Sequence, residues 1–262
     1  MNQYGSLLDS IPHPLAEQLA RCASLKRVGS GEVVATLGEP IVAVVVGGWF
    51  RLSRFDHQGG QYLVCLRRKG RFIGLESAVG ADVPASEVTA FGPGTLLTWP
   101  AEEFAALVHA NAALAIAAAR AMAQLTEEEF KVRHRAKSVG IGPRIAQLLL
   151  LYAAEVGEAT GNGYQVHFPF NQNDLAEILE VRRESISTRI CQLEYANLIK
   201  RTGRDLRIDV RLARIFLEAA GLPDDRSDLD ETGCEPVQVR ADSWREPQRT
   251  GLENRSLATV RT

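Results

Sequence analysis

The sequence predicts an α+β protein: an N-terminal antiparallel β-barrel or jelly roll, then a long helix, then a C-terminal winged helix-turn-helix domain. Three observations support this order. Short β-rich segments alternate with turn signals between residues 26 and 99. An alanine-rich stretch of high helix propensity follows over residues 101–138. Two short helical patterns and a basic hairpin then occur between residues 171 and 208.

The first part of the chain predicts a barrel. Residues 1–25 predict a short amphipathic helix, with Leu15, Leu19 and Cys22 at helical spacing. Strand-like segments such as IVAVVVGGWFRLSRF and QYLVCLRR follow, separated by glycine-containing turns such as DHQGG and RKG. Antiparallel strands at such close spacing are typical of a sandwich or barrel. We therefore assign residues 1–110 to a barrel domain.

Residues 111–138 predict one long helix. Its residues Leu114, Ala118, Ala121 and Leu125 are spaced by four, three and four. This spacing is typical of a helix that packs lengthwise on a partner, which is either a second copy of the chain or its own barrel. Small alanines allow close approach and the helix exceeds what the barrel needs, so we predict a dimer seam. The spacing continues to Glu128, where pairing should loosen.

A second domain is predicted over residues 139–222, after the hinge-like sequence GIGP. RIAQLLLLYAAEVG predicts a buried helix, EATGNG a turn and YQVHFPF a short strand. The last helix, DVRLARIFLEAAG, ends at a glycine and proline stop signal. Residues 223–262 are polar, mixed in charge and aperiodic, which predicts a largely disordered tail.

The segment over residues 171–208 predicts a helix-turn-helix. Asn171 can cap a helix, with Asp174 at the third helical position. A second helix begins near Arg182 and carries its apolar face on Ile186, Ile190 and Leu193. Two short helices joined by a tight turn form this motif.

The outward face of the second helix indicates DNA binding. Its N-terminal end, which enters the major groove in helix-turn-helix proteins, carries Arg182, Arg183, Glu184, Ser185, Ser187 and Thr188. Arginine can donate two hydrogen bonds to guanine, and glutamate can accept one from cytosine. The hairpin LIKRTGRDLRI follows, and its cations Lys200, Arg201, Arg204 and Arg207 predict a wing along the phosphate backbone.

Composition excludes several other classes. The formal net charge of the 262 residues is -2, so a nucleic-acid surface must be local. No run of about eighteen apolar residues and no signal-peptide pattern occurs. The cysteines, Cys22, Cys65, Cys191 and Cys234, form no metal-ligand spacing, which fits a reduced cytoplasmic protein. The predicted barrel lacks the histidine cluster that a cupin-type metal enzyme needs, so we predict no enzyme.

The stretch NQNDLAEILEVRRESISTRICQLEYANLI resembles the DNA-binding signature of the Crp/Fnr superfamily of bacterial transcription regulators. The resemblance extends over about residues 20–220, because the barrel, long helix and winged domain follow in that family's order. It implies a homodimer paired along the long helix and a two-fold symmetric DNA operator. It also implies contact with RNA polymerase, and an effector in the barrel that sets the DNA-binding domains across a hinge at Val139-Gly140.

Carried over by this resemblance, the base-reading positions fall on Arg183, Glu184 and Thr188. The third position is commonly arginine in the family. Either the neighbouring Arg189 takes this role or the protein reads a different base there. The turn's frequent glycine is replaced by Glu180, which adopts positive φ less easily.

The resemblance also indicates candidate effector-binding residues: Gly74 and Glu76 in the first half of a phosphate-binding cassette, Ser86 in its second half, and Glu129 on the long helix. The cassette's Arg-Ser pair is replaced by PASE, and three consecutive glutamates are poor neighbours for a phosphate. Both points argue against a cyclic nucleotide.

Other cofactors have little support. The cysteines are not clustered for an iron–sulfur centre, and His57, His109 and His134 are only isolated candidates for haem ligation. We identify no cofactor, which leaves an unidentified small ligand, a redox signal or constitutive binding. The alternative function is a cyclic-nucleotide-responsive signalling module whose helical domain contacts protein. The basic wing and the missing cassette arginine favour the regulator.

Overall fold

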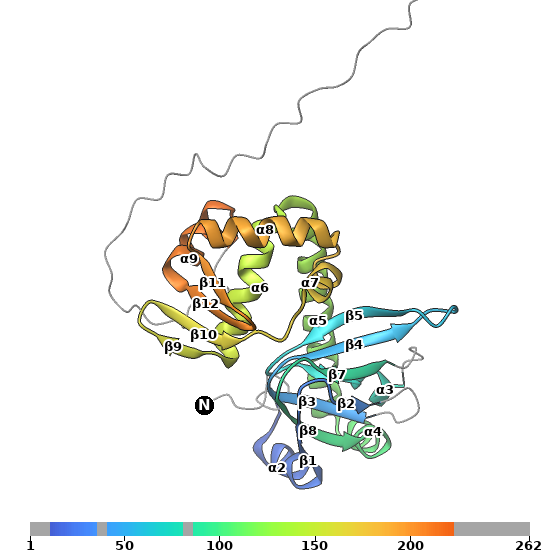
Figure 1. Ribbon diagram of the computed structural model, residues 1–262. Helices are drawn as coiled ribbons and strands as arrows, with labels where there is room; N and C mark the ends of the chain where they lie inside the picture. The colour runs from blue at the N-terminus through green and yellow to red at the C-terminus, as the bar shows by residue number, and fades with distance from the viewer. Residues whose placement is uncertain (1–10, 36–40, 81–85, 223–262) are drawn as a thin grey trace, which may run out of the picture. The chain divides into compact units, whose positions relative to one another are not determined.

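The computed structural model describes residues 11–35, 41–80 and 86–222, with the backbone alone over 131–137 (Figure 1). The described elements belong to one compact unit that ends at Pro223. They confirm the predicted α+β class, with antiparallel sheets first and the helix-turn-helix last. The predicted tail, residues 223–262, lies outside the described residues.

The barrel is a pair of four-stranded antiparallel sheets. Their strands are β1 (Ser24–Val28), β2 (Val33–Ala35), β3 (Ile41–Gly47), β4 (Phe50–Phe55), β5 (Gln61–Arg67), β6 (Phe72–Ile73), β7 (Glu87–Ala90) and β8 (Gly94–Pro100). The strand orders are β1-β8-β3-β6 and β2-β7-β4-β5, so neighbours in a sheet are often distant in sequence. Alternating side chains of both sheets, such as Phe50, Leu52 and Leu96, are buried between them.

Among the described residues, the helices that accompany the barrel are α2 (His13–Cys22), α3 (Leu75–Ala78), α4 (Ala101–Ala110) and α5 (Ala112–Ser138). Leu15 and Leu19 of α2 are buried as predicted, but Cys22 is exposed. The Leu19 carbonyl accepts a hydrogen bond from the Trp99 indole at 2.8 Å, which fastens α2 to β8.

Helix α5 contradicts the predicted dimer seam. Leu114 and Ala118 are 0% exposed and Ala121 is 7% exposed within a single chain. All three pack in the core that α5 shares with α2, α3 and α4, while Leu125 is half-buried. Leu114, Ala118 and Ala121 therefore pack on the chain's own barrel domain, which was the alternative to a dimer partner for this spacing.

The second domain contains α6 (Ile141–Val156), β9 (Glu158–Thr160), β10 (Gly163–His167), α7 (Gln172–Ile178), α8 (Arg183–Tyr195), β11 (Ile199–Thr202), β12 (Asp205–Asp209) and α9 (Val210–Ala219). Its sheet has the order β11-β12-β10-β9. Glu158–Thr160 pairs with β10 as a strand, although the sequence predicted a turn there. Ile145, Ile186 and Ile208 are fully buried between its helices and sheet.

No single helix among the described residues is long and apolar enough to cross a membrane. Helix α4 and the part of α5 up to Phe130 satisfy the length and composition criteria only as a pair, and they are bent by 117° at their junction.

Candidate nucleic-acid interface

The first helix of the motif, α7, begins with the predicted cap. The Asn171 side-chain oxygen accepts hydrogen bonds from the backbone N–H groups of Asn173 at 2.8 Å and Asp174 at 3.0 Å. The Asp174 carboxylate accepts one from the Asn171 N–H at 2.8 Å, which completes a capping box. This reciprocal pair fixes where α7 starts, and with it the geometry of the motif.

The turn between the helices contains a strained residue. Glu180 has φ 53°, the left-handed conformation that the sequence predicted would be unfavourable for this side chain. The preceding Leu179 carbonyl accepts a hydrogen bond from Arg144 Nη2 at 2.5 Å. Arg144 is buried, which lowers its pKa, while the Glu180 charge acts in the opposite direction. A buried guanidinium on α6 therefore supports the turn.

Sequence reasoning did not identify Arg144. Its partner is 35 residues away, and the only local signal was a cation followed by the apolar run IAQLLLLY. A cation on a buried helix is unusual unless it is paired.

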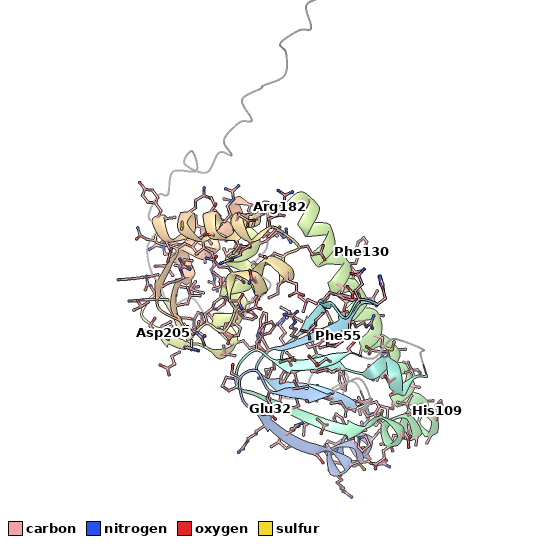
Figure 2. The ribbon with its side chains drawn as sticks, turned by 45° about the vertical axis from the view of Figure 1, so that its right-hand side comes forward. Glu32, Phe55, His109, Phe130, Arg182 and Asp205 are labelled. Atoms are coloured by element: carbon pink, nitrogen blue, oxygen red, sulfur yellow. The ribbon has the colours of Figure 1, made fainter. Side chains whose placement is uncertain are left out.

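Helix α8 presents the predicted surface. It begins at Arg183, with Arg182 as an extended N-cap residue, and crosses α6 (Figure 1). Ile186, Ile190 and Leu193 are buried as predicted. Of the proposed DNA-contacting side chains on this helix, Arg182, Arg183, Glu184 and Thr188 are exposed, and Ser185, Ser187 and Arg189 are half-buried. Figure 2 labels Arg182 at the N-terminal end of α8.

Thr188 and Arg189 differ in orientation and in partners. Thr188 is exposed, and its hydroxyl donates to the Glu184 carbonyl at 3.0 Å. Arg189 is half-buried, and its Nη1 donates to Gln192 Oε1 at 2.9 Å. On a helix, Thr188 shares the outward stripe of Glu184, whereas Arg189 turns toward the side of the buried face.

Strands β11 and β12 form the predicted basic hairpin, joined through Gly203 at φ 65°. Lys200 and Arg204 are exposed. Arg201 instead makes two hydrogen bonds to the Glu194 carboxylate, at 2.6 and 2.9 Å. This bond lowers the pKa of Glu194 and raises the pKa of Arg201. Arg201 is thus already neutralised, which makes it a weaker phosphate contact than Lys200 or Arg204.

A cleft of about 450 Å³ brings these elements together. Its polar lining comes from the start of α7, the start of α8 and the hairpin, and includes Asn171, Gln172, Asn173, Arg183, Arg201 and Arg204. Asp205, labelled in Figure 2, adds one carboxylate at its edge. Amide donors and guanidinium groups on one concave surface suit a phosphate backbone.

The candidate effector residues lie in the barrel domain. Gly74 has φ 72° and precedes the short helix α3, whose first turn contains Glu76. A Cβ atom at Gly74 would lie 2.0 Å from the Ile41 carbonyl oxygen, so only glycine fits this turn. Ser86 accepts a hydrogen bond from Arg54 Nε at 3.2 Å.

Glu129 and its neighbour Glu128 are compensated by arginines. Glu129 accepts from Arg67 Nη2 at 3.1 Å, and Glu128 pairs with Arg71. The sequence alone did not show that arginines pair with these glutamates. Because the pairs neutralise their charge, the glutamates are a weaker argument against a bound phosphate.

Cys65 lies among these groups. Burial raises the pKa of its thiol to about 11, and the charges of Arg67, Glu129, Glu76 and Arg54 act on it as well. These charges include those of the candidate effector residues Glu76 and Glu129 and that of Arg54, which bonds Ser86.

The described residues contain no group of three or more histidine, cysteine or acidic side chains able to hold a metal ion. His57 and His109 are exposed, and the side chain of His134 lies outside the described part.

Two family models match the sequence: the cyclic nucleotide-binding domain over residues 25–111 and the Crp-like helix-turn-helix domain over residues 143–213. Together they cover more than half of the chain, in the order that the fold shows. The chain belongs to the Crp/Fnr family. Its fold is that of Crp-family transcription regulators. No curated protein matches the sequence.

Solved structures share this Crp/Fnr fold. A presumed cAMP-binding regulatory protein from Silicibacter pomeroyi is 20% identical, with a TM-score of 0.63 over 81% of this chain and 94% of its own. FixK2 from Bradyrhizobium japonicum is 17% identical, with a TM-score of 0.58 over 74% and 96%. TTHA1359, a Crp/Fnr-family transcriptional regulator from Thermus thermophilus, is 19% identical, with a TM-score of 0.59 over 76% and 100%.

Proposed function

We propose that this Crp/Fnr-family protein is a sequence-specific DNA-binding transcription regulator that binds a two-fold symmetric operator as a homodimer. The observation that carries the proposal is the exposed N-terminal end of α8, beside a cleft lined by arginines and amide donors. Helix-turn-helix proteins place this end of the second helix against base edges in the major groove. Contact with RNA polymerase rests on family membership alone.

Base recognition is assigned to three exposed residues of α8. Arg183 can donate two hydrogen bonds to guanine, and Glu184 can accept from the cytosine amino group. Thr188 takes the third position in preference to Arg189, because Thr188 faces outward and Arg189 is half-buried against Gln192. Threonine in place of the family's usual arginine implies a different base preference there.

Phosphate contacts are assigned to three further exposed cations. Arg182 precedes the first turn of α8, and Lys200 and Arg204 project from the hairpin. Ser185 and Ser187 add hydroxyl groups near the positive end of the helix dipole. Arg201 contributes less because Glu194 already neutralises it.

The dimer contact is assigned to the exposed face of α5. Ile116, Ala119, Ala123, Thr126 and Phe130 are all exposed and follow one another by three, four, three and four residues. Ile116 is 54% exposed and Phe130 is 63% exposed, and Figure 2 labels Phe130 on α5. A mainly apolar stripe at this spacing fits parallel packing against α5 of a second copy of the chain.

The effector site is assigned to the surroundings of Cys65, where Gly74, Glu76, Ser86 and Glu129 remain the candidate contacts. A cyclic nucleotide is disfavoured because the cassette supplies no arginine of its own. Arg54 and Arg67 nearby are engaged by Ser86 and Glu129. The effector is therefore assigned to another small-ligand class.

The Arg183→Ala variant tests the assignment of base recognition. It should lose about 10- to 100-fold in affinity for a selected operator and keep its affinity for unrelated DNA. Lys200→Ala should weaken binding to the operator and to unrelated DNA equally. It should also lower the number of counterions released on binding, which sets the salt dependence, by about one. Fluorescence anisotropy at several salt concentrations measures both effects.

Arg27→Ala is the matched control, because Arg27 is an exposed arginine on the barrel strand β1. It should bind as the unmodified protein does. An Arg183→Ala variant that still prefers the operator to unrelated DNA would refute this role for Arg183.

A further inference from the structure

One carboxylate of the DNA-binding domain, that of Glu177, accepts two hydrogen bonds from the barrel. Glu177 of α7 accepts from Arg51 Nη2 of β4 at 2.8 Å and from the Leu63 N–H of β5 at 2.5 Å. The guanidinium of Arg51 also lies 3.8 Å from Asp174, the capping-box carboxylate. The side chains of Arg51 and Glu177 are 18% and 32% exposed, so water screens this pair less than a surface ion pair.

A second hydrogen bond, within the barrel, fixes the orientation of the Arg51 side chain. Its Nε donates to the hydroxyl of Ser53 at 2.7 Å, and Ser53 is 0% exposed. A guanidinium held by a buried hydroxyl loses little further freedom on pairing. A movement of the β4 backbone is therefore passed on to α7 rather than absorbed by side-chain rotation.

A second pair of hydrogen bonds joins the barrel to the end of α6. Glu155 accepts from the Trp49 indole at 2.9 Å and from the Lys69 N–H at 2.9 Å. Trp49 is 3% exposed and packs edge-on against Tyr152 and Phe170, with ring centroids 5.4 and 6.0 Å away. The residue just before β4 is thus part of the core of the DNA-binding domain.

Strand β4 has two faces with different partners. Arg51 and Ser53 are engaged on the side of α7, whereas Leu52 is buried in the barrel core and Arg54 bonds Ser86. Alternation of side chains along a strand produces this division. Ser86, one of the candidate effector residues, and the first helix of the DNA-binding motif therefore contact opposite faces of one strand.

Strand β5 shows the same division. Cys65 is paired with Leu52 and packs against the barrel core. Its neighbour Leu66 packs against the core of the DNA-binding domain, and the Leu63 N–H donates to Glu177. Cys65 and Arg54 therefore lie on the same two strands whose Leu63 N–H and Arg51 hold α7.

We propose that strands β4 and β5 directly connect the barrel interior to the first helix of the DNA-binding motif, with Arg51 and Glu177 as positioning residues. This connection is additional to the covalent path through α5 and the Val139-Gly140 hinge. Its regulatory meaning rests on the proposed function, but the contact itself can be tested without DNA.

Amide hydrogen exchange of residues 172–179, measured by mass spectrometry on the full chain, tests this proposal. Arg51→Gln and Glu177→Gln should each speed exchange in α7 by roughly 5- to 30-fold, and the double variant should add little, because both remove one interaction. Arg51→Lys, which keeps the charge but loses the bond geometry, should give an intermediate rate.

Transmission is tested by Arg54→Gln, which alters the barrel face of β4. It should change exchange in α7 when Arg51 is present and have no such effect in the Arg51→Gln background. Arg71→Gln is the matched control, because it removes a similar half-buried ion pair between barrel and α5 and should leave α7 unchanged. Unchanged α7 exchange in Arg51→Gln, additive effects in the double variant, or an Arg54→Gln effect that persists without Arg51 would each overturn the proposal. No DNA is present, so these outcomes do not depend on whether the protein binds an operator.

Discussion

Two residues of the helix-turn-helix domain adopt left-handed backbone conformations although they are not glycine: Glu180 at φ 53° and Asn197 at φ 56°. Asparagine tolerates this region because its short side chain can bond locally, whereas glutamate has no such advantage. The strain at Glu180 lies in the turn that sets the angle between α7 and α8, and the buried Arg144 supports it from α6.

The Glu180→Gly variant should therefore be more stable than the unmodified protein. Glycine relieves the left-handed strain but loses more conformational entropy on folding. The net effect should raise the free energy of unfolding by about 0.5–1 kcal/mol. Asn197→Gly should change stability less, and Glu180→Gln, which removes only the charge, should not stabilise. Urea unfolding of the three variants measures the differences. A Glu180→Gly variant that unfolds at lower urea would show that the Glu180 charge beside Arg144 outweighs the strain.

At the scale of the element, α5 has two faces with separate tasks. One face carries Leu114, Ala118 and Ala121 into the barrel-domain core, and the other exposes Ile116 and Ala123. Both faces follow spacings of three and four residues, so periodicity alone could not distinguish the core face from the face proposed for pairing. Burial in the folded chain makes the distinction.

Substitutions on the two faces should therefore have different consequences. Ala123→Glu places like charges opposite each other in the proposed dimer and should weaken pairing at least about 100-fold without unfolding the barrel. Ala121→Glu buries an unpaired charge and should destabilise the fold by roughly 3 kcal/mol or more. Light scattering after size exclusion reports pairing, and thermal unfolding reports stability. A monomeric unmodified protein at micromolar concentration, or a dimeric Ala123→Glu variant, would refute the proposed face.

At the scale of the whole molecule, local patterns were predictable and long-range partners were not. The cap at Asn171 and the buried stripe of α8 depend on neighbours within one or two helical turns, which the sequence displays. The partners of Glu177 are 126 and 114 residues away, and those of Glu155 are 106 and 86 residues away. Only the folded chain shows that a strand pair of the barrel holds α7.

The candidate site follows the same rule. The identity and exposure of Arg183 and Glu184 were evident from the amphipathic pattern of α8. Neutralisation of Arg201 by Glu194, and of Glu129 by Arg67, required knowledge of which side chains meet. The charged groups could therefore be predicted from the sequence, but the structure was needed to show which of them remain available to a ligand.

Under the proposed function, a dimer of this chain reads a symmetric DNA site through α8. Selection of bound sequences from a randomised DNA pool by the full-length protein, followed by sequencing, tests this recognition. Two recognition helices related by a two-fold axis should enrich an inverted repeat with half-sites about 10 base pairs apart, centre to centre. A pool that remains random after selection, or that enriches only isolated half-sites or direct repeats, would contradict the account.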